Sequence, residues 1–342
     1  MILSQDHIRL IYRLKKELSG PRRIVITTHQ GPDGDAMGSS LALYMFLKKR
    51  GHDVRVIVPN DYPEYLHWLP LNDDVVNFMK NRPLGEELVE KAEFVFHLDY
   101  NVLSRSADMT RFLYKCRATR VLIDHHPDPE MPCRYVFIDT RVSSTCELLY
   151  GIMKRWDHTL IDHDIATCLY TGVMTDTGSF CYRSAGEQTF FVAAELMRYG
   201  ISREDIYDKV YDNYSENRAR LQGYCLNEKM EVFPQYRAAL ISLDLEEQRR
   251  YGFVIGDTEG FVNLPLSIKG IRFSAFFLEK EDKTKMSFRS KGNFSVNDFS
   301  RTHYGGGGHL NAAGGDSKIP MPELIQQFRD LLQTYEKELN DE

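Results

Sequence analysis

Short apolar runs that end in an acidic residue or a histidine recur through the first half of this chain. The first run, Arg23–Thr27, is followed at once by a loop that carries His29, Asp33 and Asp35. A short run rich in β-branched residues is typical of a buried strand. In open α/β sheets, ligands bind outside the carboxyl ends of the strands. The pattern therefore predicts a polar site at one edge of a sheet.

Three further fragments repeat this pattern, and we expect each of them to be a strand with polar residues at its end. The polar residues that follow these runs are Asp99, then Asp124 with His125 and His126, and finally Asp176. Four such ends supply more carboxylate and imidazole groups than one metal ion can use. Two ions are the simplest way to employ all of these side chains.

The loop after the first run has the composition of a metal site. His29, Asp33 and Asp35 suit a divalent ion such as Mn²⁺, which accepts both carboxylate oxygen and imidazole nitrogen. We expect Gly31 and Gly34 to permit the backbone angles that turn these ligands toward one point. An isolated acidic turn is more often simply solvated, so the metal hypothesis depends on the three other fragments.

The order of the predicted elements indicates an α/β protein. Short apolar runs alternate with helical patterns as far as about residue 200, which is typical of βαβ units and a parallel sheet. We expect a helix over 36–50, with Gly51 as its C-terminal cap. The segment Ser144–Glu147 fits a helix capping box, and a phosphate contact is its alternative role.

The length of 342 residues favours more than one domain. We predict a parallel-sheet domain over 1–200 and a helical linker over 201–235. A smaller α/β domain with a mixed sheet would follow over 236–342. The first domain would hold the metals, and the second would bind the substrate.

Composition narrows the functional classes. The net charge of −6 argues against a protein that coats long nucleic acid, because that task requires neutralising many phosphates. A short phosphorylated substrate stays compatible with this charge. The chain shows neither a signal sequence nor an apolar stretch long enough to span a bilayer, and its six cysteines lack a C-x-x-C pair. We therefore expect a cytoplasmic protein with free thiols and no membrane contact.

At this point the chain resembles a known superfamily. The residues His29-x-x-x-Asp33-x-Asp35, Asp99, Asp124-His125-His126 and Asp176 are similar to the four motifs of the DHH phosphoesterases. A glycine run followed by His309 and Ala312-Ala313-Gly314 resembles the signature of the associated DHHA1 domain. The two-domain layout is most similar to the group of nanoRNA-degrading oligoribonucleases and pAp phosphatases. The resemblance extends from about Arg23 to near the C-terminus.

The resemblance implies an active site in a cleft between the domains, with two Mn²⁺ ions that activate water. Co²⁺ and Mg²⁺ are the alternative ions. The implied ligands are His29 and Asp33 for one ion, Asp35, His125 and Asp176 for the other, and Asp99 as the bridge between them. His126 would contact a phosphate oxygen or protonate the leaving group. Asp124 would orient its neighbours, and direct ligation by Asp124 stays open.

The second domain offers candidate contacts to the substrate. The glycine run lacks the Gly-Lys-Ser/Thr of a Walker loop, although successive glycine N–H groups can form an anion-binding concavity. We expect a binding loop there rather than a merely flexible one. Arg289 would clamp a terminal phosphate, and His303 offers a flat face for a base. The candidate substrate-binding residues are Arg289, His303, Gly305, Gly306, Gly307, Gly308 and His309.

The leading hypothesis is a metal-dependent phosphoesterase acting on very short RNA and 3′,5′-bisphosphonucleotides. It would release 5′-mononucleotides and remove the 3′-phosphate of adenosine 3′,5′-bisphosphate (pAp). Long duplex DNA is not an expected partner, and a homodimer stays open. The alternative enzymes are a cyclic or linear dinucleotide phosphodiesterase, an exopolyphosphatase or pyrophosphatase, and a RecJ-like exonuclease. A nucleotide sensor without catalysis is the alternative outside the enzymes, and loss of a metal ligand would indicate it.

Overall fold

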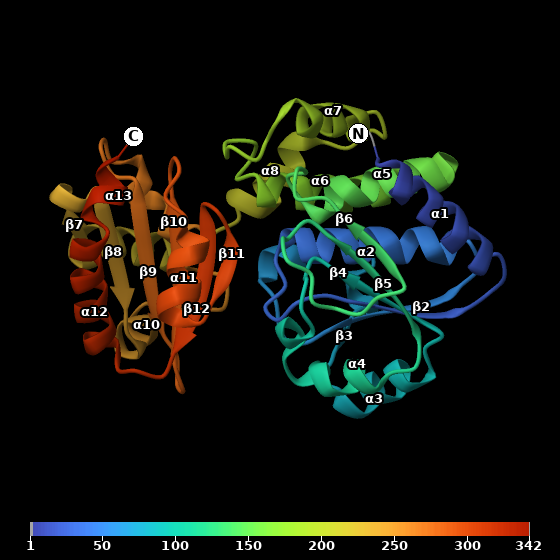
Figure 1. The fold of residues 1–342 in the computed structure, drawn as a ribbon, viewed down its shortest axis with the longest axis horizontal. Helices are drawn as coiled ribbons and strands as arrows, with labels where there is room; N and C mark the ends of the chain where they lie inside the picture. Colours follow the sequence, from blue (N-terminus) through green and yellow to red (C-terminus); the bar gives the residue numbers. More distant parts are fainter. Residues whose placement is uncertain (1–2, 342) are drawn as a thin grey trace. The chain divides into compact units, whose positions relative to one another are not determined.

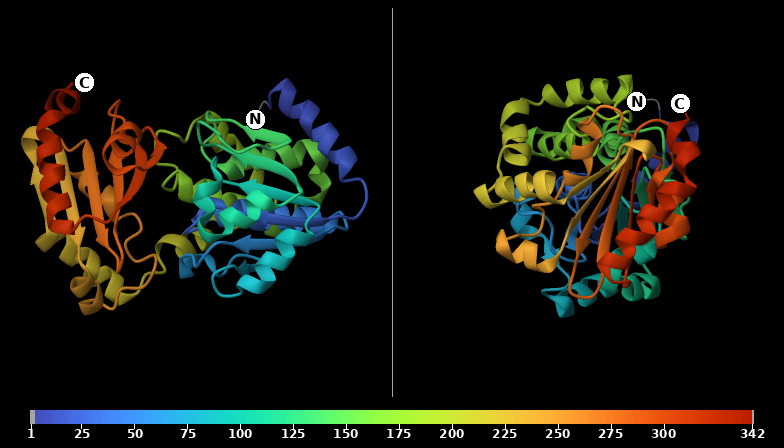
Figure 2. Two further views of the ribbon diagram at one scale, coloured as in Figure 1. Left: turned by 60° about the horizontal axis from the view of Figure 1, so that its bottom comes forward. Right: turned by 90° about the vertical axis from the view of Figure 1, so that its left-hand side faces the viewer.

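The computed structural model describes residues 3–341 and divides the chain into two compact units, Met1–Asn213 and Tyr214–Glu342. Each unit has its own sheet, as Figures 1 and 2 show. The connector expected over 201–235 is shared between the units. Helix α8 (Arg203–Tyr211) belongs to the first unit, and α9 (Glu216–Tyr224) belongs to the second.

The first unit is built on a six-stranded sheet in the order β3-β2-β1-β4-β5-β6, in which all neighbouring strands are parallel. The strands are β1 (Arg23–Thr27), β2 (Asp53–Val58), β3 (Val76–Asn77), β4 (Phe94–Leu98), β5 (Thr119–Asp124) and β6 (Tyr135–Ile138). The strand order reverses between β1 and β4. In doubly wound sheets, this switch point is where ligands bind.

Helices cover both faces of this sheet (Figure 1). They are α1 (Gln5–Glu17), α2 (Gly34–Lys49), α3 (Arg82–Lys91), α4 (Thr110–Lys115), α5 (Thr145–Asp157), α6 (His163–Asp176) and α7 (Glu187–Met197), besides α8. Successive residues of a strand point to opposite faces. Ile24 and Ile26 of β1 therefore join the core with α1, α2 and α5, whereas Val25 packs with α3 and α4. The parallel sheet predicted for this region is confirmed.

Three of the four apolar runs are strands, and the fourth prediction was wrong. Asp176 follows no strand, because the run before it is the helix α6. Residues 165–174 of α6 are all buried, and a fully buried apolar run has no polar face to reveal its period. The C-terminal end of a helix, rather than that of a strand, therefore presents Asp176.

Helix α2 begins and ends close to the predicted positions. Asp33 is its N-cap, and Gly51 follows its C-cap with a left-handed φ of 82°. Gly31 also has a positive φ, of 63°, as expected for the loop. The reason given for Gly34 was wrong, because this residue is the first of the helix. A Cβ at Gly34 would lie 2.3 Å from Thr175 Oγ1, so close packing against α6 requires glycine there.

The second unit has a mixed six-stranded sheet in the order β11-β12-β10-β9-β8-β7. Its strands are β7 (Met230–Phe233), β8 (Ala238–Leu243), β9 (Phe273–Glu279), β10 (Thr284–Ser290), β11 (Gly307–His309) and β12 (Ala312–Ser317). Only β8 and β9 pair in parallel. The smaller α/β domain with a mixed sheet is thus confirmed.

An aromatic core fills one face of this second sheet. Helices α11 (Val296–Tyr304) and α12 (Met321–Thr334) pack there, and Figure 2 shows α12 running beside the strands. The core includes Phe273, Phe288 and Phe328. Two shorter helices, α10 (Leu245–Arg250) and α13 (Glu336–Asn340), complete the unit. No helix within residues 3–341 combines the length and the apolar character that crossing a membrane requires.

Candidate metal centre

The first unit brings all of its predicted ligand residues together at the switch point of its sheet. Three strand ends and one helix end supply them. The possible ligand atoms lie within 4.8 Å of one another in each of three groups: His29, Asp33 and Asp99; Asp35, His125 and Asp176; and Asp99, Asp124 and His126. Asp99 belongs to two of these groups. The arrangement is therefore one connected centre rather than separate acidic turns.

The loop after β1 orients both of its ligand side chains in the first group. His29 donates from Nδ1 to the carbonyl oxygen of Gln30 at 3.0 Å, which leaves Nε2 to face the carboxylates. Asp33 accepts hydrogen bonds on Oδ1 from the N–H groups of Asp35 and Ala36, both at 3.0 Å. Its other oxygen, Oδ2, lies 3.8 Å from His29 Nε2. Asp33 thus caps α2 with one oxygen and turns the other toward His29.

Asp99 lies at the middle of the centre in a left-handed backbone conformation that few non-glycine residues adopt. Its φ is 64°, and its side chain is buried. Strained backbone of this kind persists where the surrounding structure fixes it, often at functional sites. Oδ2 lies 3.4 Å from His29 Nε2, and Oδ1 lies 3.5 Å from His125 Nε2. Burial would raise the pKa of Asp99, but these two histidines outweigh burial and hold it well below its ordinary value.

His125 points its Nε2 atom at three carboxylates. The distances are 3.4 Å to Asp176 Oδ2, 3.5 Å to Asp99 Oδ1 and 3.9 Å to Asp35 Oδ2. Burial lowers the pKa of His125, but the three carboxylates outweigh it and raise that pKa to about 10. Ligand atoms around an octahedral ion are separated by ~3 Å when each lies about 2.1 Å from the ion. The separations around His125 Nε2 are only slightly larger, so this group fits a divalent cation.

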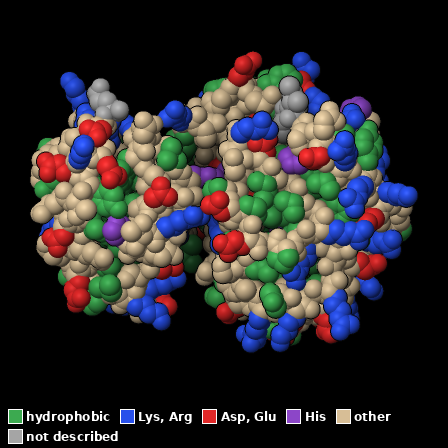
Figure 3. All heavy atoms as spheres, viewed as in Figure 1, with side chains coloured by type: hydrophobic (Ala, Val, Ile, Leu, Met, Phe, Trp, Pro, Cys, Tyr) green, Lys and Arg blue, Asp and Glu red, His purple; other side chains and the backbone are tan. Residues whose placement is uncertain are grey.

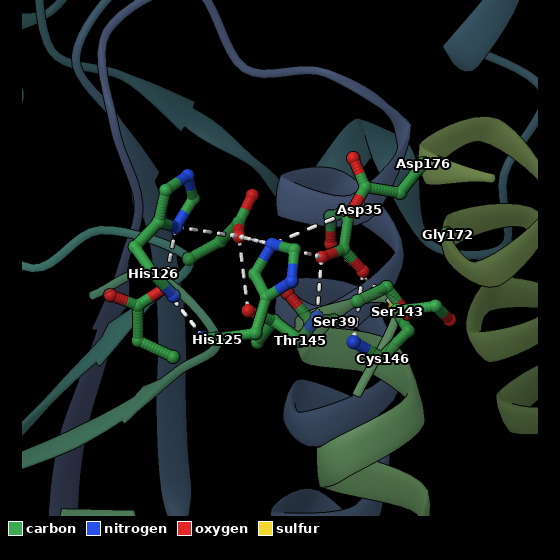
Figure 4. A network of polar contacts seen from close by, with 12 residues as sticks. Asp35, Ser39, His125, His126, Ser143, Thr145, Cys146, Gly172 and Asp176 are labelled. Atoms are coloured by element: carbon green, nitrogen blue, oxygen red, sulfur yellow. Dashed lines mark hydrogen bonds and ion pairs between the residues drawn. The ribbon is translucent and has the colours of Figure 1, made fainter. Parts of the chain in front are cut away.

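Asp35 is fully enclosed beside α5 (Figure 4). Burial raises its pKa well above the ordinary value, and the neighbouring Asp99 and Asp176 carboxylates raise it further. Such crowding of like charges disfavours ionisation unless cations are present. Buried carboxylates and imidazoles together fit divalent ions that accept both oxygen and nitrogen ligands.

Asp124 holds the ring of His126. Its Oδ1 accepts hydrogen bonds from His125 N–H at 2.8 Å, from His126 N–H at 3.2 Å and from His126 Nδ1 at 2.8 Å. Oδ2 of Asp124 is buried and makes no hydrogen bond among the described residues. Burial also lowers the pKa of His126. The neutral ring then carries its proton on Nδ1, facing Asp124, and a lone pair on Nε2.

Two residues near this centre were not predicted from the sequence to contact it. Thr145 contacts the carboxylates of both Asp35 and Asp99. Arg105 accepts a hydrogen bond on its carbonyl oxygen from Gln30 N–H at 2.6 Å, next to His29 in the chain. Burial and the positive charge of Arg105 lower the pKa of His29, while Asp99 and Asp33 outweigh them. Thr145 lies within the predicted capping box, but that motif concerns the start of a helix and gave no sign of contacts to Asp35 and Asp99. Arg105 lies in no local motif.

The capping box predicted over Ser144–Glu147 is half formed. Ser144 Oγ accepts a hydrogen bond from Glu147 N–H at 3.0 Å, as an N-cap should. The Glu147 carboxylate does not return to the Ser144 backbone. Instead, it accepts hydrogen bonds from Ser143 N–H at 3.0 Å and from Ser143 Oγ at 2.6 Å.

In the second unit, the sheet register places Arg289 and His309 on the same face. Both residues pair directly with Ala312, Arg289 from β10 and His309 from β11. Directly opposed residues of antiparallel strands point to the same side. His303 lies apart from them, on α11, which packs against Phe288 on the other face. Its ring contacts Phe299 and shares a hydrogen bond of 2.8 Å between Nε2 and Tyr335 Oη.

The glycine run, expected as a loop, is partly a strand. Gly305 ends α11 with a φ of 60°, and Gly307–His309 forms β11. A Cβ at Gly306 would lie 1.9 Å from the carbonyl oxygen of Gly314, and Gly308 has a φ of 151°. The helix end therefore favours glycine at Gly305, and the hairpin requires glycine at Gly306 and Gly308. Gly307 is the exception, because the nearest atom to a Cβ there would be 3.6 Å away.

Comparisons with known proteins agree with this architecture. The family model for the N-terminal domain of the DHH family matches residues 23–173, and the DHHA1 domain model matches 252–340. The crystal structure of an exopolyphosphatase-related protein from Bacteroides fragilis is 40% identical, with a TM-score of 0.92 over 99% of both chains. The bifunctional oligoribonuclease and PAP phosphatase NrnA of Thermus thermophilus is 29% identical over 98% of this chain and 95% of that protein. NrnA of Bacillus subtilis is 27% identical, over 85% of this chain and 88% of that protein.

Together, the fold and these relatives define a hydrolase that acts on phosphoester bonds. More particularly, the chain belongs to the DHH phosphoesterase family and carries a DHHA1 domain in its second unit. Members of this family depend on metal ions, and the first unit has acidic and histidine groups that could bind them.

Proposed function

We propose that this protein hydrolyses very short RNA to 5′-mononucleotides and removes the 3′-phosphate of pAp, with two Mn²⁺ ions. The observation that carries the proposal is a pair of adjacent three-residue donor groups. One contains His29, Asp33 and Asp99, the other contains Asp35, His125 and Asp176, and His125 Nε2 lies 3.5 Å from Asp99 Oδ1. The names of the relatives from Thermus thermophilus and Bacillus subtilis support the substrate class. The proposal also assigns the protein to the cytoplasm.

Each residue of the centre has a distinct role in this proposal. We assign the ligands as follows: His29 and Asp33 would hold one ion, Asp35, His125 and Asp176 would hold the other, and Asp99 would serve both. When bound, two divalent ions stabilise the attacking and leaving oxygens of a phosphoryl displacement and make hydroxide accessible near neutral pH. The strain at Asp99 and the shared contacts of its two oxygens support its central position.

The pair Asp124 and His126 is the proposed proton-handling element. The hydrogen bond from His126 Nδ1 to Asp124 Oδ1 fixes the ring, so that Nε2 is the atom that can exchange a proton. A bound phosphate dianion would favour protonation of Nε2, since an opposite charge nearby stabilises the imidazolium. His126 would then donate that proton to a phosphoryl oxygen or to the leaving group.

The position and charge of Arg105 support the proposal that the substrate carries a phosphate. The carbonyl oxygen of Arg105 accepts a hydrogen bond from Gln30 N–H, next to His29. Burial lowers the pKa of His126, and the positive charge of Arg105 lowers it further. No ion pair joins Arg105 to a carboxylate within residues 3–341. A charge-assisted hydrogen bond to a phosphoryl oxygen is the contact such an arginine makes well. In the second unit, Arg289, His309 and the backbone of the glycine run would supply further phosphate contacts.

The surface charge favours a short substrate. Acidic and basic side chains are intermingled on the faces of both units that Figure 3 shows. Binding long nucleic acid depends on many adjacent phosphate contacts, which a continuous basic track would provide. A few local cations and two metal ions are enough for a dinucleotide or pAp. The net charge of −6 agrees with this choice.

A length series of labelled RNA, from dinucleotides upward, tests the proposal together with pAp. Manganese-loaded protein should cleave dinucleotides faster than long strands and should release phosphate from pAp. Faster cleavage of long strands, or no release of phosphate from pAp, would contradict it. The same assays with a cyclic dinucleotide and with polyphosphate address the alternative enzymes.

A further inference from the structure

The first two N–H groups of α5 hold the carboxylate of Asp35. Thr145 N–H donates to Oδ2 at 2.6 Å, and Cys146 N–H donates to Oδ1 at 2.8 Å. Figure 4 shows Asp35 beside the start of this helix. The N-terminus of a helix favours negative charge because its N–H groups are unpaired and its dipole is positive there. Both oxygens of Asp35 are therefore fixed by one rigid element.

The hydroxyl of Thr145 reaches a second carboxylate. Thr145 Oγ1 donates to Asp99 Oδ1 at 3.0 Å, and the Thr145 side chain is fully buried. Asp35 belongs to one candidate ligand group and Asp99 to the other. A single residue thus contacts both groups, through its backbone and its side chain.

The start of α5 is itself tightly held. Glu147 Oε2 accepts hydrogen bonds from Ser143 and from Thr189 Oγ1 of α7, the latter at 2.9 Å. Helix α6 packs closely against the same point. A Cβ at Gly172 would lie 2.2 Å from Cys146 Sγ and 2.9 Å from Asp35 Oδ1. Thr145 therefore has little freedom to move relative to either carboxylate.

We propose that Thr145 is a positioning residue that fixes Asp35 relative to Asp99 and so sets the spacing of the two metal ions. The inference rests on the proposed two-ion function. Partners of this kind orient the ligands, and their loss typically lowers metal affinity by about 10–100-fold. A purely structural role in starting α5 would instead leave metal affinity unchanged, because Ser144 is the N-cap.

Two substitutions separate these roles. Thr145→Val keeps the shape and the backbone N–H but removes the hydroxyl, whereas Thr145→Ser keeps the hydroxyl. Thr171→Val is the matched control, since Thr171 is also buried and its hydroxyl donates to the carbonyl oxygen of Thr167 at 2.8 Å, within the same helix. If Thr145→Val fails to fold, Thr145→Ala replaces it. The metal affinities of Thr145→Ala and Thr145→Ser are then compared in the same way.

The experiment is a Mn²⁺ titration of the metal-free protein. Calorimetry measures the affinity for each ion, and electron paramagnetic resonance detects coupling between paired ions. Thr145→Val should lower the affinity for at least one ion by about 10–100-fold and alter the coupled signal. Thr145→Ser and Thr171→Val should match the wild type. Wild-type affinity and coupling in Thr145→Val would overturn the inference, as would an equal loss in Thr171→Val. A wild-type protein that binds no ion pair would instead contradict the proposed function.

Discussion

The two units place their candidate functional residues in opposite environments. In the first unit, the side chains of Asp35, Asp99 and His125 are at most 4% exposed. Neighbouring residues form hydrogen bonds or ion pairs with them. In the second unit, Arg289 and His309 are half-buried on a sheet whose other face holds an aromatic core. Burying charge is costly unless it is compensated. The difference indicates that the first unit is built around cations, whereas the second presents a surface shaped largely by its backbone.

The largest effect should come from the residue at the middle of the buried centre. Asp99→Asn removes the charge that faces both His29 and His125. Turnover of pAp should fall by at least about 10²–10³-fold, because electrostatic stabilisation of the reaction is lost. Phosphate release and bound manganese should be measured together. Wild-type turnover in this variant would contradict the central position of Asp99.

A smaller effect should follow from removing the nearby cation. Arg105→Gln should raise KM for pAp by roughly 10–150-fold, which corresponds to losing one hydrogen bond between charged groups. Manganese binding should be unchanged, since Arg105 is not a ligand in the proposal. Arg111→Gln is the control, because this exposed arginine lies over the ring of Phe112. Equal KM values for both variants would exclude Arg105 from substrate binding.

Close packing behind the centre should link stability to metal binding. Gly172→Ala would place a Cβ against Cys146 and Asp35, and should cost about 1–3 kcal/mol of unfolding free energy. It should also weaken manganese binding, because Asp35 must shift. Denaturant unfolding and metal titration measure both effects. Lower stability with unchanged metal affinity would show that Asp35 tolerates the shift.

The glycine run allows the sharpest test of the second unit. Gly306→Ala should destabilise the protein, because its Cβ would meet the backbone of Gly314. Gly307→Ala should change the unfolding free energy by less than about 0.5 kcal/mol. If a phosphate approaches this backbone, Gly307→Ala should still raise KM for pAp by on the order of tenfold, about 1.4 kcal/mol. An unchanged KM would remove Gly307 from the substrate site.

The strands and their polar ends could be predicted because their signals are local. Three short apolar runs were bounded by polar loops, so β1, β4 and β5 and the residues after them were found. The helix before Asp176 was mistaken for a strand because complete burial hides its period. Strand β11 could not be predicted, since glycines have little strand preference and pairing with β12 decides their conformation.

The contacts that orient the ligands within the centre could not be predicted from the sequence. Thr145 meets a carboxylate that is 110 positions earlier in the chain, and only the folded sheet and helices bring the two together. The same holds for Arg105, which lies in the short 3-10 helix Leu103–Met109 and contacts Gln30 in the segment after β1. Ligand types were predictable from chemistry, whereas the groups that orient them depend on tertiary structure.

The proposed reaction requires a pair of cations that share Asp99. Anomalous diffraction at the manganese edge, from crystals grown with Mn²⁺, tests this directly. We predict two peaks roughly 3.5–4 Å apart, one beside His29 and Asp33 and the other beside Asp35, His125 and Asp176. A single peak, or peaks away from Asp99, would contradict a two-ion centre.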